Sequence, residues 1–316
     1  MLSHIPNKND IAGAANLIKP YINKTPVLTS STFNQLYTAS VFFKCENFQK
    51  VGAFKSRGAV HAILNLSEEK RKTGVGTHSS GNHAQALARA AKLFEIPAYI
   101  VMPENSPKVK IEAVEAYGGK ITFCKPTLEA RESTLHDIIE KTGITEIHPY
   151  DNYDIIAGQA TAAMELLQEV PDLDMILCPV GGGGLLSGSA LSSAHFSRNT
   201  EVIACEPDGA NDAYKSFHAG YIIPSQKPDT IADGLLTSLG KRNFPIIQKH
   251  VSEIVTVHDE SIIQAMKWVF ERMKIVIEPS SAVPIAAIMA EKVAVSGKKV
   301  GVIISGGNVD LKKLPF

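Results

Sequence analysis

The sequence has little of several features that mark whole classes of protein. Its four cysteines are far apart and form no CxxC pair, which excludes a zinc finger or a disulfide framework. Lys plus Arg and Asp plus Glu both number 32, so no charge excess points to nucleic acid or a membrane surface. No run approaches the ~20 apolar residues of a membrane span, and "MLSHIPNKND" lacks the apolar core of a signal peptide. We therefore expect a cytoplasmic protein whose partners are small molecules or another copy of itself.

What is present is a chain of 316 residues with enough apolar content, 44%, for a sizeable core. Its middle alternates strand and helix signals. Expected strands are residues 97–103, 120–124, 175–180, 201–206 and 299–307, and expected helices are 108–118 and 127–143. This alternation predicts βαβ units and a mostly parallel α/β sheet with helices on both faces. Ligands of such sheets bind at the carboxyl ends of the strands.

The organisation along the chain suggests two domains. The regular βαβα run predicts a small domain at residues 74–146, inserted in a larger domain made of residues 1–73 and 147–316. The Pro-rich stretch "YIIPSQKPDT" (221–230) is expected to be a surface loop.

A lysine stands where a helix is expected to begin, in "GAFKSRGA" (52–59). The positive end of the helix dipole disfavours an ammonium group there, so the pKa of Lys55 should be depressed. We interpret the neighbouring Arg57 as adding to this positive field. Lys55 would then lose its proton readily and serve as a nucleophile and base.

Two loops have the composition of anion sites. "CPVGGGGLLSG" (178–188) places four glycines between an apolar strand and a helix, which suits a phosphate better than it suits a simple turn. It is not a Walker loop and misses the dinucleotide spacing. "THSSGNHAQALA" (77–88) places short polar side chains at a helix start, which suits a carboxylate, although a serine cap alone would explain one serine.

Two further turns carry weaker signals. Ser305 follows a strand in "VIISGGNVD" and is placed for one hydrogen bond to a ligand. "EPDGAND" (206–212) offers Glu206 and Asp212 to a hard cation, but on spacing alone a solvated acidic turn is the better interpretation.

A phosphate cradle, a lysine of low pKa and a carboxylate loop together match pyridoxal 5'-phosphate, which has a phosphate, an aldehyde that an amine captures, and a ring nitrogen that needs a partner. The motifs "KCENFQKVGAFKSRGA", "THSSGNHAQALA", "PVGGGGLLSG", "EPDGAND" and "ISGGNVD" resemble those of the fold-type-II pyridoxal-phosphate enzymes of the serine racemase and serine/threonine dehydratase group. The resemblance spans nearly the whole chain and is strongest to the eukaryotic serine racemases. It implies the tryptophan synthase β-like fold.

The resemblance implies roles for individual residues. Lys55 would be the Schiff-base lysine and the base on one face of the substrate, and Ser80 the acid/base on the other face. The cofactor would be held by Phe54, Lys55, Asn82, Gly181, Gly182, Gly183, Gly184 and Ser305, with Asn82 on its phenolic oxygen and Ser305 on its ring nitrogen. The substrate would be held by Ser79, Ser80, Asn82, His83 and Thr237.

The resemblance also implies accessory ligands and a homodimer. Glu206, Asp212 and the carbonyl of Ala210 would bind Mg²⁺, or Ca²⁺ or Mn²⁺. ATP would bind at the dimer interface through Ser30, Ser31, Lys50, Gln85 and Tyr117. Thr32, Val51, Thr237 and the loop "HPYDNYD" (148–154) depart from the mammalian pattern.

The activity implied is racemisation of L-serine to D-serine, with β-elimination of serine or threonine to pyruvate or 2-oxobutanoate and ammonia. The first alternative is a dedicated catabolic dehydratase of threonine, serine or 3-hydroxyaspartate with little racemisation. The chain ends soon after "SGGNVD", so the regulatory domain of biosynthetic threonine dehydratases is not expected. Cysteine synthase relatives are disfavoured, because their motifs "GGSVKDR" and "GNTG" do not occur. A non-catalytic cofactor-binding protein and a nucleotide-dependent dehydrogenase are the remaining alternatives.

Overall fold

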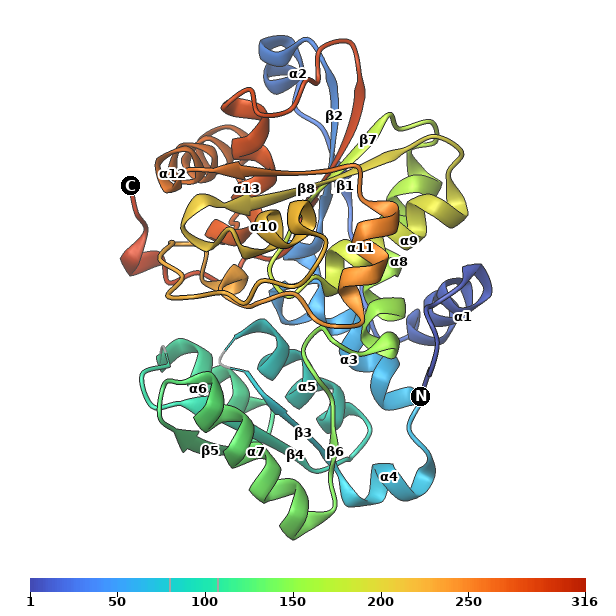
Figure 1. Ribbon diagram of the computed structural model, residues 1–316, viewed down its shortest axis with the longest axis vertical. Coiled ribbons are helices and arrows are strands. Elements are labelled where there is room, and N and C mark those ends of the chain that lie inside the picture. The colour runs from blue at the N-terminus through green and yellow to red at the C-terminus, as the bar shows by residue number, and fades with distance from the viewer. Residues whose placement is uncertain (80, 107) are drawn as a thin grey trace.

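The computed structural model describes residues 1–79, 81–106 and 108–316, and these form two sheets flanked by helices (Figure 1). The larger sheet has the strand order β1-β2-β10-β7-β8-β9, with every neighbouring pair parallel except β1 and β2. Its strands are β1 (Val27–Leu28), β2 (Ser40–Cys45), β7 (Met175–Pro179), β8 (Glu201–Pro207), β9 (Glu253–Val257) and β10 (Lys299–Ile304). The predicted α/β class with a mostly parallel sheet is confirmed.

The smaller sheet is entirely parallel, with the order β5-β4-β3-β6. Its strands are β3 (Val75–His78), β4 (Ala98–Pro103), β5 (Lys120–Cys124) and β6 (Thr145–Glu146). All four lie inside residues 74–146, for which a separate small domain is expected, and that division stays a prediction.

Helices follow most of the strands. They are α1 (Lys8–Ile18), α2 (Ser31–Tyr37), α3 (Lys55–Leu64), α4 (Glu68–Thr73), α5 (Asn82–Leu93), α6 (Lys108–Ala116), α7 (Leu128–Thr142), α8 (Tyr153–Glu169), α9 (Gly184–Phe196), α10 (Asp212–Ala219), α11 (Asn243–His250), α12 (Asp259–Trp268) and α13 (Pro279–Met289). Short 3₁₀ turns are η1 (Glu46–Phe48), η2 (Lys50–Gly52), η3 (Asp208–Ala210), η4 (Asp233–Leu235) and η6 (Leu311–Lys313), and η5 (Val269–Met273) is a π-helical turn. Residues 221–230 contain no helix or strand, as expected for a loop.

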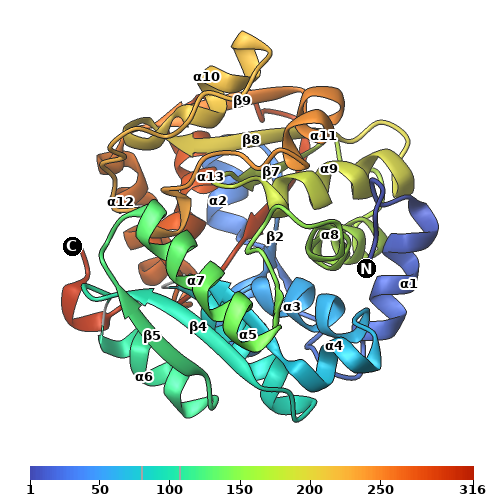
Figure 2. The ribbon, with the colours of Figure 1, turned by 60° about the horizontal axis from the view of Figure 1, so that its bottom comes forward.

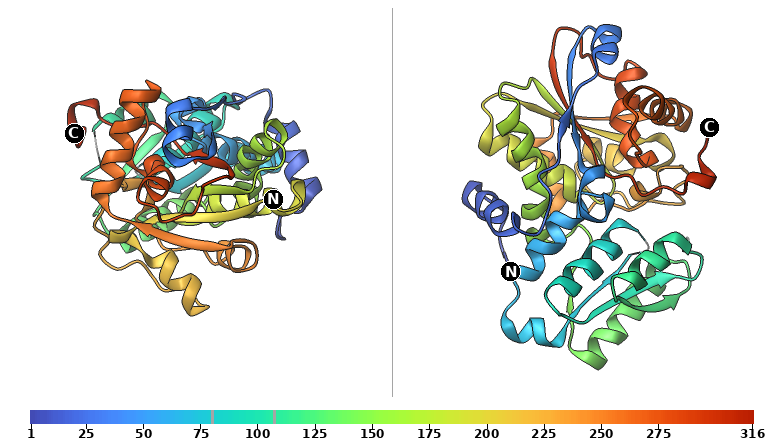
Figure 3. Two further views of the ribbon diagram at one scale, coloured as in Figure 1. Left: turned by 90° about the horizontal axis from the view of Figure 1, so that it is seen from above. Right: turned by 180° about the vertical axis from the view of Figure 1, so that it is seen from behind.

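The core lies on both faces of the larger sheet, because successive side chains along each strand point to opposite faces and both faces are covered by helices. In β7, Met175 and Leu177 pack in the same apolar cluster as residues of α12 and α13. Ile176 and Cys178 face the other way and pack with residues of α8 and α9. Figure 3 (right) shows these two helix pairs on opposite sides of the sheet. All four cysteines are buried and free.

The smaller sheet is built in the same way. Ile100 of β4 packs with the apolar faces of α5 and α6, whereas Val101 packs with Leu135 of α7. Figure 2 shows α7 on one side of this sheet and α5 and α6 on the other. Helix α7 has the expected ends, since Thr127 caps its first turn and Gly143, at φ 71°, follows its last residue. In the described ranges, no helix has the length and apolar character needed to cross a membrane.

Candidate active site

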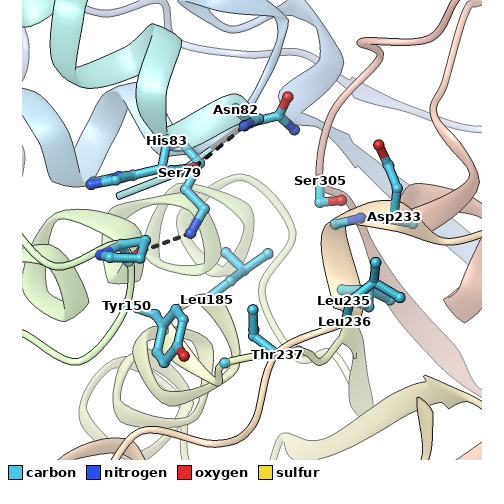
Figure 4. A pocket seen from close by; sticks show the side chains of 18 of the residues that line it. Ser79, Asn82, His83, Tyr150, Leu185, Asp233, Leu235, Leu236, Thr237 and Ser305 are labelled. Atoms are coloured by element: carbon cyan, nitrogen blue, oxygen red, sulfur yellow. Dashed lines mark hydrogen bonds between the residues drawn. The ribbon is translucent and has the colours of Figure 1, made fainter. Parts of the chain in front are cut away.

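A cavity of about 390 Å³ lies where the carboxyl ends of strands from both sheets meet. Its walls include Ser79 after β3, Gly181 after β7 and Ser305 after β10. Figure 4 shows Asn82 and His83 on one side of this cavity, with Thr237 and Leu235 on the opposite side. The cavity has the size and mixed lining of a small-molecule site.

Lys55 is the first residue of α3 and lines this cavity. Its Nζ donates a hydrogen bond of 2.7 Å to the carbonyl of Pro149 and lies 5.1 Å from the centre of the Phe54 ring. Burial lowers the pKa of Lys55 to about 8, although the carboxylate of Glu278 raises it in part. A lysine of this pKa is partly neutral near pH 7, which is the form that acts as nucleophile or base.

Arg57 does not cause this shift, and our interpretation of it from the sequence was wrong. Its guanidinium is fully buried and is paired with Glu46 (Nε–Oε2, 2.7 Å) and Glu165 (Nη1–Oε1, 2.7 Å). The ammonium of Lys44 lies 2.6 Å from the same Glu165. Two cations facing two carboxylates leave this cluster without net charge. Burial therefore accounts for the low pKa of Lys55, whereas Arg57 joins η1, α3 and α8.

The four glycines form an open cradle at the start of α9. Gly183 has a φ of 93°, which strongly favours glycine, and it precedes the first residue of the helix. A Cβ on Gly182 would lie 2.4 Å from the ring of Tyr150, so a side chain does not fit there. The first main-chain N–H groups of a helix have no acceptor within the helix. All four glycines line the cavity, so these groups are available to an anion there.

The start of α5 lies on another side of the cavity and carries Asn82 and His83. Ser79 precedes it and lines the cavity as well, whereas Ser80 lies outside the described residues. The Nε2 of His83 lies 2.9 Å from the carbonyl of Ile147, and burial places the pKa of His83 well below its usual value. A neutral ring that donates from Nε2 has only a lone pair at Nδ1. A carboxylate at this position would therefore meet the main-chain N–H of His83 and not its ring N–H.

Ser305 is held by hydrogen bonds immediately after β10. Its Oγ lies 3.0 Å from the Oγ of Ser281, and its carbonyl accepts a 3.0 Å hydrogen bond from the main-chain N–H of Phe54. An antiparallel bridge joins Ala53 to Gly306 beside it. These contacts fix the position of Ser305 relative to the segment that carries Lys55.

The comparisons with known proteins agree with this geometry. Residues 18–306 match the family model described as "Pyridoxal-phosphate dependent enzyme". The chain belongs to this family. It is 51% identical to a serine racemase of Dictyostelium discoideum, with 96% of this chain and 95% of that protein covered. It is 48% identical to a beta-hydroxyaspartate dehydratase of Paracoccus denitrificans, with 99% of each covered. The solved structure of maize serine racemase is 42% identical and superposes with a TM-score of 0.96, covering 98% of this chain and 96% of that one.

The residues of the cavity fit pyridoxal 5'-phosphate. A phosphate suits the glycine cradle, because all four glycines line the cavity at the start of α9 and leave main-chain N–H groups for an anion. Lys55 supplies an amine inside the same cavity, and Ser305 a hydroxyl. Bound there, the cofactor would supply an aldehyde for the lysine and an electron sink for the bonds at the substrate Cα.

The turn after β8 contains a buried carboxylate that suits a cation. Neither carboxylate oxygen of Asp212 has a hydrogen-bond partner of normal geometry, although the hydroxyl of Ser225 and the main-chain N–H groups of Leu239 and of Asp212 itself are near. Burial raises the pKa of Asp212 to about 6 and that of Glu206 to about 8. Both oxygens of Glu206 accept 2.8 Å hydrogen bonds, from the N–H groups of Ala213 and Tyr214. Within the described ranges, no third His, Cys, Asp or Glu side chain completes a metal cluster there.

The five residues expected to bind ATP lie in two places. Ser30 and Ser31 stand at the start of α2, where Ser30 caps the first turn. Lys50 lies in η2, which contacts α5, the helix that carries Gln85, and Tyr117 packs on the apolar cluster of α5. Helix α2 lies at the far end of the larger sheet from α5 (Figure 1).

The lining residues that were missed in the sequence include Tyr150, Arg131 and Glu278. The ring of Tyr150 covers Gly182, and burial raises the pKa of its phenol while nearby Thr237 lowers it. Arg131 reaches the cavity from α7, and its Nε is shielded from solvent without a hydrogen-bond partner. Among the described carboxylates, none forms an ion pair with Arg131.

Proposed function

We propose that the protein racemises L-serine to D-serine and also eliminates water from serine or threonine. The proposal depends on one arrangement: Lys55 lies in the same cavity as the glycine cradle and the start of α5. The 51% identity to a serine racemase over nearly the whole chain supports the same activity.

Each part of the cavity would have one task. The start of α5 would hold the substrate carboxylate through Ser79 and main-chain N–H groups, with Asn82 on the ring oxygen of the cofactor. Lys55 Nζ would take the Cα proton on one face, and Ser80 Oγ would return a proton on the opposite face. Phe54 and Ser305 would orient the cofactor, and Thr237 would contact the substrate side chain.

Accessory features complete the proposal. Mg²⁺, or Ca²⁺ or Mn²⁺, would bind Asp212, Glu206 and the Ala210 carbonyl, since the oxygens of Asp212 lack partners that a hard cation would supply. We also propose a cytoplasmic homodimer that binds ATP between subunits. The separation of Ser30 and Ser31 from Lys50, Gln85 and Tyr117 suits a site that two copies complete.

The proposal is tested by one incubation of the cofactor-loaded protein with L-serine, in which D-serine and pyruvate are quantified together. D-serine supports the racemase, and pyruvate without D-serine makes the protein a dehydratase. Parallel samples with ATP, with Mg²⁺ and with a chelator test the accessory sites. A rate that none of these additions changes would contradict those sites.

Replacing Ser80 with alanine separates the two reactions. If Ser80 is the second acid/base, the rate of D-serine formation should fall by about 10²- to 10⁴-fold, whereas pyruvate formation from L-serine, which needs only the Lys55 face, should fall less than about tenfold. Both products are measured from one reaction, with Ser133→Ala on the exposed face of α7 as the matched control. Equal losses of both products would refute this role.

A second function is favoured by Arg131, namely the dehydration of 3-hydroxyaspartate. A guanidinium that lines the cavity without a carboxylate partner suits a substrate with a second carboxylate. The 48% identity to a beta-hydroxyaspartate dehydratase supports this alternative.

Arg131→Gln is expected to distinguish these substrates. Loss of one charge-assisted contact of about 1.5–3 kcal/mol should raise KM for 3-hydroxyaspartate by about 10- to 100-fold, because a neutral amide binds a carboxylate less tightly. KM for L-serine should change less than about threefold. Exposed Arg198→Gln is the control, and KM values are compared from initial rates. Equal changes for both substrates would show that Arg131 does not select the dicarboxylate.

A further inference from the structure

Along the wall of the cavity, a chain of side-chain hydrogen bonds leads from the segment that precedes Lys55 to the buried carboxylate of Glu278. Asn308 Nδ2 donates to the carbonyl of Val51 at 2.7 Å and to Asn82 Oδ1 at 2.9 Å. Asn82 Nδ2 in turn lies 2.9 Å and 3.1 Å from the two oxygens of Glu278. The main-chain N–H of Asn308 closes the chain with a 3.3 Å contact to Glu278 Oε2.

This chain fixes the orientation of both amides. The carbonyl of Val51 can only accept, so the atom of Asn308 that faces it must be Nδ2. Both hydrogens of that nitrogen are then used, and the atom of Asn82 that meets it must be Oδ1. The Nδ2 of Asn82 therefore faces Glu278 with one hydrogen and has the other left for the cavity, which Asn82 lines.

Glu278 is buried close to several other charged groups. Its side chain is only 4% exposed, and it precedes the first residue of α13. The charged groups that face it are Lys55 of α3, Lys110 of α6 and Asp233 of η4. Burial raises the pKa of Glu278 to about 7, while Asn82 and the N–H of Asn308 lower it in part.

We propose that Glu278 is a positioning residue whose carboxylate, together with Asn308, holds the Asn82 amide with one N–H turned toward the cofactor. A protonated Glu278 would keep its carbonyl oxygen as an acceptor but would turn a hydroxyl toward Asn82 or Asn308, which are both donors, and this would weaken the alignment. The proposal depends on the cofactor of the family and not on which amino acid is the substrate. Glu278 does not touch the reacting atoms, but its protonation state would change the affinity for the cofactor.

Glu278→Gln tests the proposal through the affinity of the apoprotein for pyridoxal 5'-phosphate, followed by absorbance from about pH 6 to about pH 9. In the unsubstituted protein, affinity should weaken as pH falls through about 7, because Glu278 is then protonated. The variant has no carboxylate to protonate near pH 7, so its affinity should be about tenfold weaker at pH 8 and should lack the fall near pH 7, keeping only the dependence that comes from Lys55. A variant with the original acid limb and affinity would overturn the proposal.

Asn308→Ala provides an independent measurement. It keeps the carboxylate of Glu278 but removes the hydrogen bond to Asn82 Oδ1 and the one to Val51 that orients the donor, so affinity should fall by about tenfold while the acid limb remains. Exposed Glu260→Gln is the matched control and should change neither quantity. Thermal melting of each holoenzyme verifies folding. If Glu278→Gln does not fold, Asn308→Ala decides alone, and unchanged affinity in that variant overturns the proposal.

Discussion

Lys55→Ala is expected to abolish covalent attachment of the cofactor and to lower turnover by about 10³-fold or more. Among the described lysines that line the cavity, only Lys55 is joined to the loop that covers the glycine cradle, through Pro149. It would serve as both anchor and base, so alanine removes two functions at once. Turnover of L-serine is measured together with the visible absorbance of the protein-bound cofactor. Mass spectrometry of borohydride-treated protein then identifies the modified lysine.

The control for this experiment is Lys24→Ala, because Lys24 is largely exposed and forms only a surface ion pair with Glu169. This variant should keep both absorbance and turnover. Lys110, which also lines the cavity, is paired with Asp233 and should not carry the cofactor in borohydride-treated protein. Cofactor found on Lys110, or retained turnover in Lys55→Ala, would refute the assignment.

The pKa of Lys55 predicts how the rate of cofactor uptake depends on pH. Only the neutral amine attacks the cofactor aldehyde, and burial lowers the pKa of Lys55 from its ordinary value of 10.5 to about 8. The rate at which apoprotein takes up the cofactor should therefore rise with pH and level off above about 8. This limb lies on the alkaline side of the one assigned to Glu278. Because the carboxylate of Glu278 raises the pKa of Lys55 in part, Glu278→Gln should keep this limb but move it to lower pH.

Much of the fold could be predicted from the sequence because its signals are local. Helix α7 could be bounded from Thr127 and Gly143, since a cap and a left-handed glycine act on their own turn. Strands such as β7 were visible as short apolar runs with buried residues on both faces. The parallel order then follows from alternation with helices, whereas which strands neighbour β10 depends on contacts between distant segments.

The candidate site could be predicted only in part, because local signals do not show which distant segments the fold brings together. Glycines after a strand and a lysine at a helix start are visible in the sequence, and Lys55, Asn82, Gly182 and Ser305 do line one cavity. Arg131 was missed because an arginine within an amphipathic helix reads as a surface residue. Glu278 was missed because its partners are brought to it by the fold and no spacing indicates them.

For Arg57 the prediction was wrong for a different reason. Because it lies two residues from Lys55 in the sequence, we expected it to lower the pKa of that lysine. Its donor positions are directed at Glu46, Glu165, Thr161 and Thr25, which belong to three separate segments: η1, α8 and the residues before β1. Nothing in "GAFKSRGA" indicates those acceptors. A charge next to Lys55 in the sequence can therefore serve the fold through ion pairs of its own, and the pKa of the lysine then depends on burial.

Arg57→Met should destabilise the protein strongly, by about 3–5 kcal/mol of unfolding free energy. The substitution preserves most of the buried volume but leaves Glu46 and Glu165 facing Lys44 alone, which is one uncompensated charge in a buried cluster. Urea unfolding of the holoenzyme measures the loss, with exposed Arg198→Met expected to change it by less than about 0.5 kcal/mol.

A second substitution shows whether the loss comes from charge or from shape. Arg57→Met combined with Glu46→Gln keeps the 2.6 Å pair of Lys44 with Glu165 and restores neutrality, so it should recover more than about half of the lost stability. Burial raises the pKa of Glu165, but Arg57 and Lys44 hold it below its ordinary value. Without Arg57 that pKa must rise, so the destabilisation of the single variant should shrink as pH falls, because the stranded carboxylate can then bind a proton. A loss that is the same at every pH, and that Glu46→Gln does not reduce, would mean that Arg57 stabilises the fold by packing and not by charge.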